Sequence, residues 1–298
     1  MEIFVISALI GLVIGLCSGL LGIGGGTLMV PVFRLGFGMS AIASTATSLF
    51  TIIPTSLMGC ATHIKNKTCI PKLGIATGLA GACTSPVGVV LASMSPSWLI
   101  MLAAACIIGY SSFTMLKKAA RMPKETPSSL AKASAGTVRA AAEKAAAAEA
   151  AKADASRKAS SVVGEEANPT DFTFTKRKVL IVIGVGLVAG LASGYVGVGG
   201  GFIMVPMFLS FLAVSMRHAS GTSLVAVTIL AIPGAIEQGL LGNIDYIAGI
   251  AMAAGSIPGA MIGASFIRRI PERQLRFMFG GFLCVAALAL LVNEYLAL

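Results

Sequence analysis

Two glycine clusters in this chain could bind an anion through backbone groups. They read Gly-Ile-Gly-Gly-Gly at 22–26 and Gly-Val-Gly-Gly-Gly at 197–201, each inside an apolar run. Consecutive glycines favour a break, because glycine costs about 1 kcal/mol against alanine in a helix interior. A short helix that restarts after the break presents free N–H groups and the positive end of its dipole. The predicted anion contacts are Gly24, Gly25, Gly26, Thr27, Gly199, Gly200, Gly201 and Phe202.

Hydroxyl side chains follow each cluster at a matched distance. The chain reads Thr-Ala-Thr-Ser at 45–48 and Ser-Gly-Thr-Ser at 220–223. Hydroxyls donate hydrogen bonds without carrying charge, which suits a site that must also release its ligand. They could equally bond back to their own helix or across to a neighbouring one, as is common in membrane helices. The residues predicted to line the site are Thr47, Ser48, Thr222 and Ser223.

Few ionisable residues fall inside or beside the apolar segments. Glu237 lies near the end of the apolar stretch 219–241 and could carry a coupling proton, or it could be hydrated near the surface. His63 follows the stretch 41–61 and is expected to be solvated. Both side chains are therefore secondary candidates.

No enzyme chemistry is predicted. Ser193 and His218 could supply a nucleophile and a base, but the equivalent Ser18 lacks such a partner, since Ala43 stands in the position equivalent to His218. No Cys/His spacing indicates a metal site. The glycine clusters also lack the strand–turn–helix setting of a dinucleotide loop, so no cofactor is expected.

The clusters are part of a longer repeat. Residues 11–33 and 186–208 align at an offset of 175, with 15 of 23 positions identical. Most remaining differences exchange one apolar residue for another. This similarity indicates two related halves, and a substrate would bind where their broken helices meet.

The composition indicates an all-α polytopic membrane protein. Hydrophobic residues make up 56% of the 298 residues and charged residues 11%, against about 25% charged in soluble domains. Eight apolar stretches are long enough to cross a bilayer. They are 3–21, 41–61, 73–93, 97–116, 179–196, 219–241, 247–266 and 274–296. Two shorter pieces, 27–37 and 202–214, follow the glycines and would span only about 16–20 Å as helix.

Three regions follow from this pattern. Residues 1–117 and 178–298 are membrane halves, and 118–177 form an Ala/Lys/Glu-rich linker. The linker core, Ala131 to Ala159, favours helix but lacks an apolar stripe to bury. A solvated linker is therefore expected.

The charge distribution favours inverted halves. If all eight long stretches cross, one side of the membrane collects 16 Lys/Arg and the other six. If 3–21 with 27–37, and 179–196 with 202–214, form re-entrant hairpins, the division becomes 21 against one. The positive-inside rule prefers the second arrangement. Two inverted repeats are predicted, each a broken re-entrant hairpin plus three transmembrane helices, with the linker cytoplasmic and both termini outside.

The doubled motif resembles the sulfite exporter TauE/SafE family. The resemblance rests on Gly11, Ser18, Gly19, Gly22, Gly24, Gly25, Gly26 and Pro31, and on their counterparts Gly186, Ser193, Gly194, Gly197, Gly199, Gly200, Gly201 and Pro206. It covers both membrane halves but not the long linker. It implies a permease for sulfite, sulfonates and related sulfur-containing anions.

The expected function is a multi-pass plasma-membrane secondary transporter of small anions. An anion channel, or a membrane scaffold that acts through the linker, are the alternatives. The net charge of +10 is assigned to topology and anionic lipid, not to nucleic acid. Homo-oligomerisation stays open.

Overall fold

The computed structural model describes residues 2–121 and 176–297, and every regular element in those ranges is a helix. The first half contains α1 (Glu2–Leu21), α2 (Gly26–Pro31), the π-helix η1 (Val32–Gly36), α3 (Ala41–Lys65), α4 (Pro71–Ser93) and α5 (Ser97–Ala120). The second half contains α7 (Lys176–Val196), α8 (Gly201–Phe211), α9 (Met216–Leu240), α10 (Tyr246–Phe266), the 3-10 turn η2 (Ile267–Arg269) and α11 (Glu272–Ala297). The helix expected at Ala131 to Ala159 lies outside the described residues.

Seven helices in the described ranges are long and apolar enough to cross a membrane. The sequence predicted eight such stretches; the first falls in α1 (Glu2–Leu21), of which Ile6–Leu21 is found as a shorter apolar helix among the described residues. An all-α polytopic membrane protein is therefore confirmed. The glycine clusters fall between α1 and α2 and between α7 and α8, so both long helices break where the sequence placed the breaks.

Helix boundaries repeat at the offset of 175. For example, α3 spans 41–65 and α9 spans 216–240, which is the same interval shifted by 175. Local signals set some of these boundaries: the Ser40 hydroxyl accepts from the Ala43 N–H at 3.1 Å before α3, and the Asp245 carboxylate accepts from the Ala248 N–H at 3.0 Å before α10.

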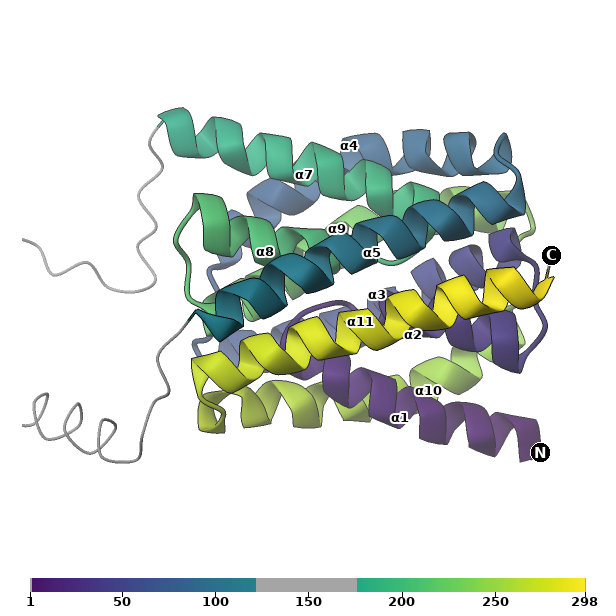
Figure 1. The fold of residues 1–298 in the computed structure, drawn as a ribbon, viewed down its shortest axis with the longest axis horizontal. Helices are drawn as coiled ribbons and strands as arrows, with labels where there is room; N and C mark the ends of the chain where they lie inside the picture. The colour runs from purple at the N-terminus through teal and green to yellow at the C-terminus, as the bar shows by residue number, and fades with distance from the viewer. Residues whose placement is uncertain (1, 122–175, 298) are drawn as a thin grey trace, which may run out of the picture. The chain divides into compact units, whose positions relative to one another are not determined.

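Two pairs of equivalent helices, α1 with α7 and α5 with α11, run in opposite directions (Figure 1). The start of α1 and the end of α11 lie at one end of the membrane unit, whereas the end of α5 and the start of α7 lie at the other. The helices pair across the halves: α1 packs on α10, and its equivalent α7 packs on α4. The two self-equivalent pairs are α3 with α9 and α5 with α11.

Glycine stripes allow the closest of these contacts. A Cβ on Gly19 of α1 would lie 2.1 Å from the Ala260 carbonyl oxygen of α10, and one on Gly194 of α7 would lie 2.0 Å from the Ser85 carbonyl oxygen of α4. Any side chain there would push the helices apart. These glycines therefore serve helix packing, as small residues often do in membranes.

Candidate functional site

The two breaks have the same backbone conformation. Gly22, Gly24 and Gly25 have φ values of 75°, 85° and 84°. Gly197, Gly199 and Gly200 repeat this with 72°, 84° and 69°. An L-residue in this left-handed region costs roughly 1–2 kcal/mol, so the motif needs glycine at these positions for conformation as well as space. We call 22–26 the first tip and 197–201 the second tip.

The two tips touch each other. A Cβ added to Gly26 would lie 2.6 Å from the Val198 carbonyl oxygen, and one added to Gly201 would lie 2.7 Å from the Gly22 carbonyl oxygen. Residues 22–26 and 197–201 are buried throughout. The two broken helices thus end against one another inside the molecule.

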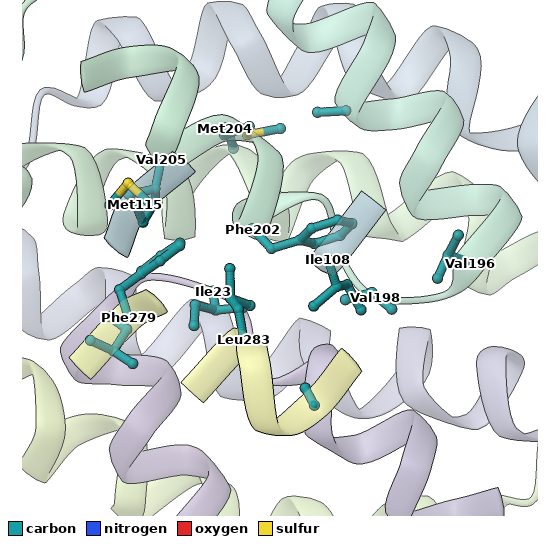
Figure 2. Packing of buried hydrophobic residues seen from close by; sticks show 14 of the residues in the cluster. Ile23, Ile108, Met115, Val196, Val198, Phe202, Met204, Val205, Phe279 and Leu283 are labelled. Carbon is teal, nitrogen blue, oxygen red and sulfur yellow. The ribbon is translucent and has the colours of Figure 1, made fainter. Parts of the chain in front are cut away.

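Two helix pairs enclose the tips. On the α5 and α11 side, Ile23, Val198 and Phe202 belong to a buried cluster with Ile108 and Phe279 (Figure 2). All five side chains are fully buried or nearly so. The tips are therefore held by apolar packing on this side.

On the α3 and α9 side, equivalent apolar residues fill the space. A Cβ on Gly24 would lie 2.9 Å from Val227 Cγ1, and one on Gly199 would lie 3.1 Å from Ile52 Cδ1. Ile52 and Val227 are both fully buried. The tips are closed to solvent in this conformation.

The hydroxyl motifs meet the tips across the halves. A Cβ on Gly22 would lie 2.3 Å from the Ser220 carbonyl oxygen of α9, and one on Gly197 would lie 2.4 Å from Thr45 Cβ of α3. The first tip thus lies on the hydroxyl motif of the second half, and the second tip lies on that of the first half. The structure brings the two predicted motifs together in this crossed arrangement.

Three of the four predicted hydroxyls already contact protein. Thr222 accepts from the Ile70 N–H at 2.9 Å, and Thr47 accepts from the Asp245 N–H at 3.0 Å. These equivalent bonds tie α9 to the start of α4 and α3 to the start of α10. Ser223 donates to the Gly22 carbonyl oxygen at 2.6 Å, so its proton is already engaged.

Several donors at the tips have no acceptor. Among the described residues, no hydrogen-bond acceptor is present for the N–H groups of Gly24, Gly25, Gly26 and Thr27, nor for those of Gly199, Gly200 and Phe202. Five buried hydroxyls, those of Ser18, Thr27, Ser48, Ser85 and Ser193, also lack partners within the described ranges. Buried polar groups normally find partners, so this concentration of free donors is unusual. These groups are uncharged hydrogen-bond donors without an acceptor in the described ranges.

Two cavities are present elsewhere in the described residues. One of about 860 Å³ lies between α4, α5, α7 and α8, and one of about 410 Å³ lies near the junction of α9 and α10. None of the predicted contact residues lines either cavity. The tips are an enclosed cluster of donors, not an open pocket.

Glu237 does not join the tips. It lies ten residues beyond Val227 on α9, about 15 Å along the helix. The side chain is partly buried, and its Oε2 atom has no hydrogen-bond partner in the described chain. Any coupling role would therefore act at a distance from the anion contacts.

The expectation that His63 is solvated was wrong. The side chain is fully buried; its Nδ1 lies 2.8 Å from Thr68 Oγ1, and its Nε2 lies 2.8 Å from the Gly19 carbonyl oxygen. Because a carbonyl only accepts, Nε2 carries the proton. The repeat contains a sequence signal for this buried pair, because at the offset of 175 His63 and Thr68 correspond to two polar residues, Gln238 and Asn243. Those two side chains also bond to each other, at 2.7 Å.

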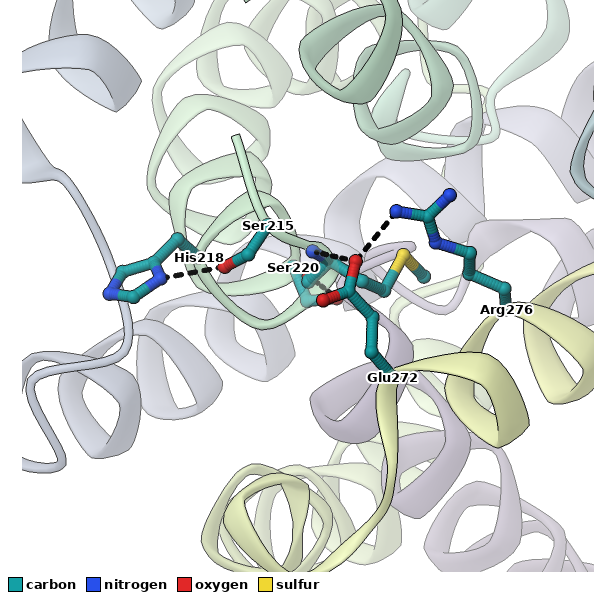
Figure 3. A network of polar contacts seen from close by, with 6 residues as sticks. Ser215, His218, Ser220, Glu272 and Arg276 are labelled. Atoms are coloured by element: carbon teal, nitrogen blue, oxygen red, sulfur yellow. Dashed lines mark hydrogen bonds and ion pairs between the residues drawn. The ribbon is translucent and has the colours of Figure 1, made fainter. Parts of the chain in front are cut away.

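His218 lies in a structural network (Figure 3). Its Nδ1 is 2.8 Å from Ser215 Oγ, before the start of α9. Beside it, Glu272 accepts from the Met216 N–H at 3.2 Å and from Arg276 at 2.6 Å. This network joins α9 to α11, and Ser193 takes no part in it.

Comparison with known proteins found a family model and several relatives. A family model described as "Sulfite exporter TauE/SafE" matches residues 7–290. The chain is 23% identical over 279 residues to "Probable membrane transporter protein YunE" of Bacillus subtilis (strain 168), covering 91% of each chain. It is 24% identical over 275 residues to "Probable membrane transporter protein YdhB" of the same organism, covering 90% of this chain and 92% of the relative.

A shorter match reaches a plant protein. The chain is 32% identical over 105 residues to "Sulfite exporter TauE/SafE family protein 3" of Arabidopsis thaliana, covering 34% of this chain and 21% of that protein. No solved structure matches the chain.

Proposed function

The chain belongs to the sulfite exporter TauE/SafE family of membrane transporters, and from this premise we propose that it is a secondary transporter of small sulfur-containing anions such as sulfite or organosulfonates. The names of its relatives support transport in general, and one of them names a sulfite exporter. Our assignment of the substrate class goes beyond these names. It rests on the family together with the uncharged donors at the tips.

The observation that carries the proposal is the set of unpaired N–H groups at the tips. Oxyanions of sulfur accept several hydrogen bonds, and helix starts favour negative charge. Gly25, Thr27, Gly200 and Phe202 supply such N–H groups from two helix starts that touch. Ser48 adds a hydroxyl without a partner in the described ranges. An anion between the tips would satisfy donors that have no partner among the described residues.

We propose further that the halves are inverted repeats that rock against each other. Support comes from the repeated helix boundaries and from the opposite directions of equivalent helices (Figure 1). Ile52 of α3 and Val227 of α9 occupy the space beside the tips. An anion can therefore enter only when α3 and α9 move away from the tips. A transition of this kind gives alternating access.

The remaining assignments follow the charge pattern. The proposed location is the cell membrane, with the linker cytoplasmic and the termini outside, because nearly all Lys/Arg then lie on one side. Glu237 is proposed to carry a coupling proton, supported by its unpartnered Oε2. Assembly into a homo-oligomer stays a prediction.

Transport by reconstituted protein tests the proposal. Proteoliposomes containing wild-type protein should take up radiolabelled sulfite, and internal unlabelled sulfite should accelerate that uptake. Gly25→Val and Gly200→Val should abolish uptake, because each places a branched side chain at a φ near 84° or 69°. Gly184→Val is the matched control, since a Cβ there meets nothing within 4 Å. All variants should remain monodisperse in detergent.

The alternatives give different outcomes. A channel would pass sulfite without acceleration by internal sulfite. A scaffold would lose its role when residues 125–170 are deleted, whereas the transporter should keep its flux. Unchanged uptake in both tip variants would contradict the proposed site.

A further inference from the structure

An apolar cavity of about 860 Å³ lies apart from the tips, between α4, α5, α7 and α8. Its volume falls in the range of small-molecule sites. Most of its walls are carbon, from residues such as Leu91, Ile107, Val188 and Met207. The proposed transport of a small anion makes no use of such a surface.

The cavity is long and opens to the surroundings of the helices. Along α5 it extends from Ala103 to Lys118, which is about 22 Å at 1.5 Å per residue. One leaflet of a bilayer has about 15 Å of hydrocarbon, so the cavity runs the depth of a leaflet and more. Tyr110 and Phe211 in its walls are 72% and 58% exposed. An extended hydrocarbon chain could enter from the side.

One end of the cavity is cationic. Lys118, in the last turn of α5, donates a hydrogen bond to the Ser210 hydroxyl of α8, and both residues line the cavity. Arg273 of α11 donates to the Ala119 carbonyl oxygen at 3.5 Å, beside Lys118. Basic groups at a membrane-facing helix end attract anionic headgroups.

The repeat shows that these polar groups are not required by the fold. At the offset of 175, the counterparts of Lys118, Tyr195 and Ser210 are Asn293, Leu20 and Leu35. Tyr195 donates to the Ser95 hydroxyl at 3.1 Å, whereas Leu20 is buried in the apolar core. Tyr195 and Ser210 have apolar counterparts and Lys118 has an uncharged one, so the cationic end is not repeated at the equivalent positions.

We propose that the cavity binds an anionic phospholipid, with one acyl chain along α5 and the phosphate at the Lys118 ammonium group. A zwitterionic phospholipid would contact the apolar walls of the cavity but would match its cationic end less well. A free phosphate ion would bind the Lys118 ammonium group but would make no contact with the apolar walls. Tyr195 and Ile203 flank the second tip, so the bound chain would pack against the hairpin that carries it.

Lipid retention tests the proposal directly. Full-length protein, delipidated in detergent, is titrated with phosphatidylglycerol or phosphatidylcholine, and bound lipid is counted by native mass spectrometry. Phosphatidylglycerol should bind with one preferred site and raise the unfolding midpoint more than phosphatidylcholine does. Inorganic phosphate should leave the midpoint unchanged. Equal retention of the two lipids, or an equal shift with phosphate, would overturn the proposal.

Variants locate the site. Lys118→Asn, the residue of the other half, should reduce the preference for phosphatidylglycerol about fivefold, since a basic residue near anionic lipid contributes about 1 kcal/mol. Lys117→Asn removes the same charge one residue away, from a side chain that lies over Phe113 at 5.9 Å and outside the cavity, and should preserve the preference. Equal loss in both variants would indicate general charge attraction and overturn the site.

Filling the cavity tests the acyl chain. Ala103→Phe should weaken retention of both lipids, and Ala103→Leu provides a milder change if the larger ring prevents folding. Retention that is unchanged in the folded variants would contradict an acyl chain along α5.

Discussion

The two tips share a backbone but differ in their side chains. Both have three glycines with positive φ at equivalent positions, and both rest on the hydroxyl motif of the opposite half. Yet Thr27, whose hydroxyl has no partner among the described residues, corresponds to Phe202, whose ring is buried in the core. The half-helix after the first tip ends in a π-helix, whereas its counterpart α8 is α-helical throughout. The comparison teaches that the crossed backbone geometry is the common requirement, while individual side chains have taken separate roles.

The largest expected effect comes from substitutions that break the backbone geometry that the two tips share. Gly22→Ala and Gly197→Ala should each destabilise the protein by about 2–5 kcal/mol, because the new Cβ combines a left-handed backbone with overlap against the facing helix. Thermal unfolding in detergent measures this, with Gly184→Ala as control. If only one of the two variants is destabilised, the tips are not equivalent.

A smaller effect should separate the two hydroxyl links. Thr222→Val leaves the buried N–H of Ile70 unpaired and should cost about 1–3 kcal/mol. Thr47→Val should cost less, because its bond to Asp245 is only partly buried. Chemical denaturation of both variants, with Thr→Ser at each site retaining the hydroxyl, checks the order. A larger loss for Thr47→Val would contradict the burial argument.

The buried pair His63 and Thr68 can be replaced by the residues at the equivalent positions of the other half, Gln238 and Asn243. His63→Gln should cost about 1 kcal/mol through imperfect pairing with Thr68. Adding Thr68→Asn copies the Gln238–Asn243 pair and should recover most of that loss, as measured by unfolding midpoints. A double variant less stable than His63→Gln alone would show that the two pairs are not interchangeable.

The smallest stability effect should come with a clear effect on binding. Ser48→Ala should change stability by less than about 0.5 kcal/mol, since its buried hydroxyl makes no bond in the described ranges. Ser223→Ala should cost about 1 kcal/mol by losing its bond to Gly22. Sulfite binding by calorimetry should weaken in Ser48→Ala. Unchanged affinity there would remove Ser48 from the site.

Much of the fold followed from local sequence. Apolar length predicted helices such as α3 and α10 to within a few residues, because a bilayer crossing requires a fixed number of apolar residues. Glycine chemistry located both breaks, since glycine adopts the positive φ at Gly24 and Gly199 without the steric cost that other residues incur. The offset of 175 found in the motifs also relates the bounds of α3 to those of α9.

The remaining features depended on tertiary packing. A sequence that repeats both motifs at one offset does not say which hydroxyls meet which tip, so the contacts of Gly22 with Ser220 and of Gly197 with Thr45 required the structure. His63 was misjudged because nearby Lys65 and Lys67 read as a surface turn. The cavity near Lys118 arises from a gap between four helices, which no local pattern encodes.

The most direct test of the anion site removes a backbone donor without changing a side chain. Replacing the Thr27 amide by an ester, through the α-hydroxy acid analogue, deletes one of the unpaired N–H groups. The Met29 amide, which donates to the Gly25 carbonyl oxygen at 3.1 Å, supplies the control. Sulfite affinity should fall about tenfold or more for the Thr27 ester, because a hydrogen bond to a charged group contributes about 1.5–3 kcal/mol. It should change little for the Met29 ester. Equal affinity in the Thr27 ester and the wild type would contradict anion binding by the tip.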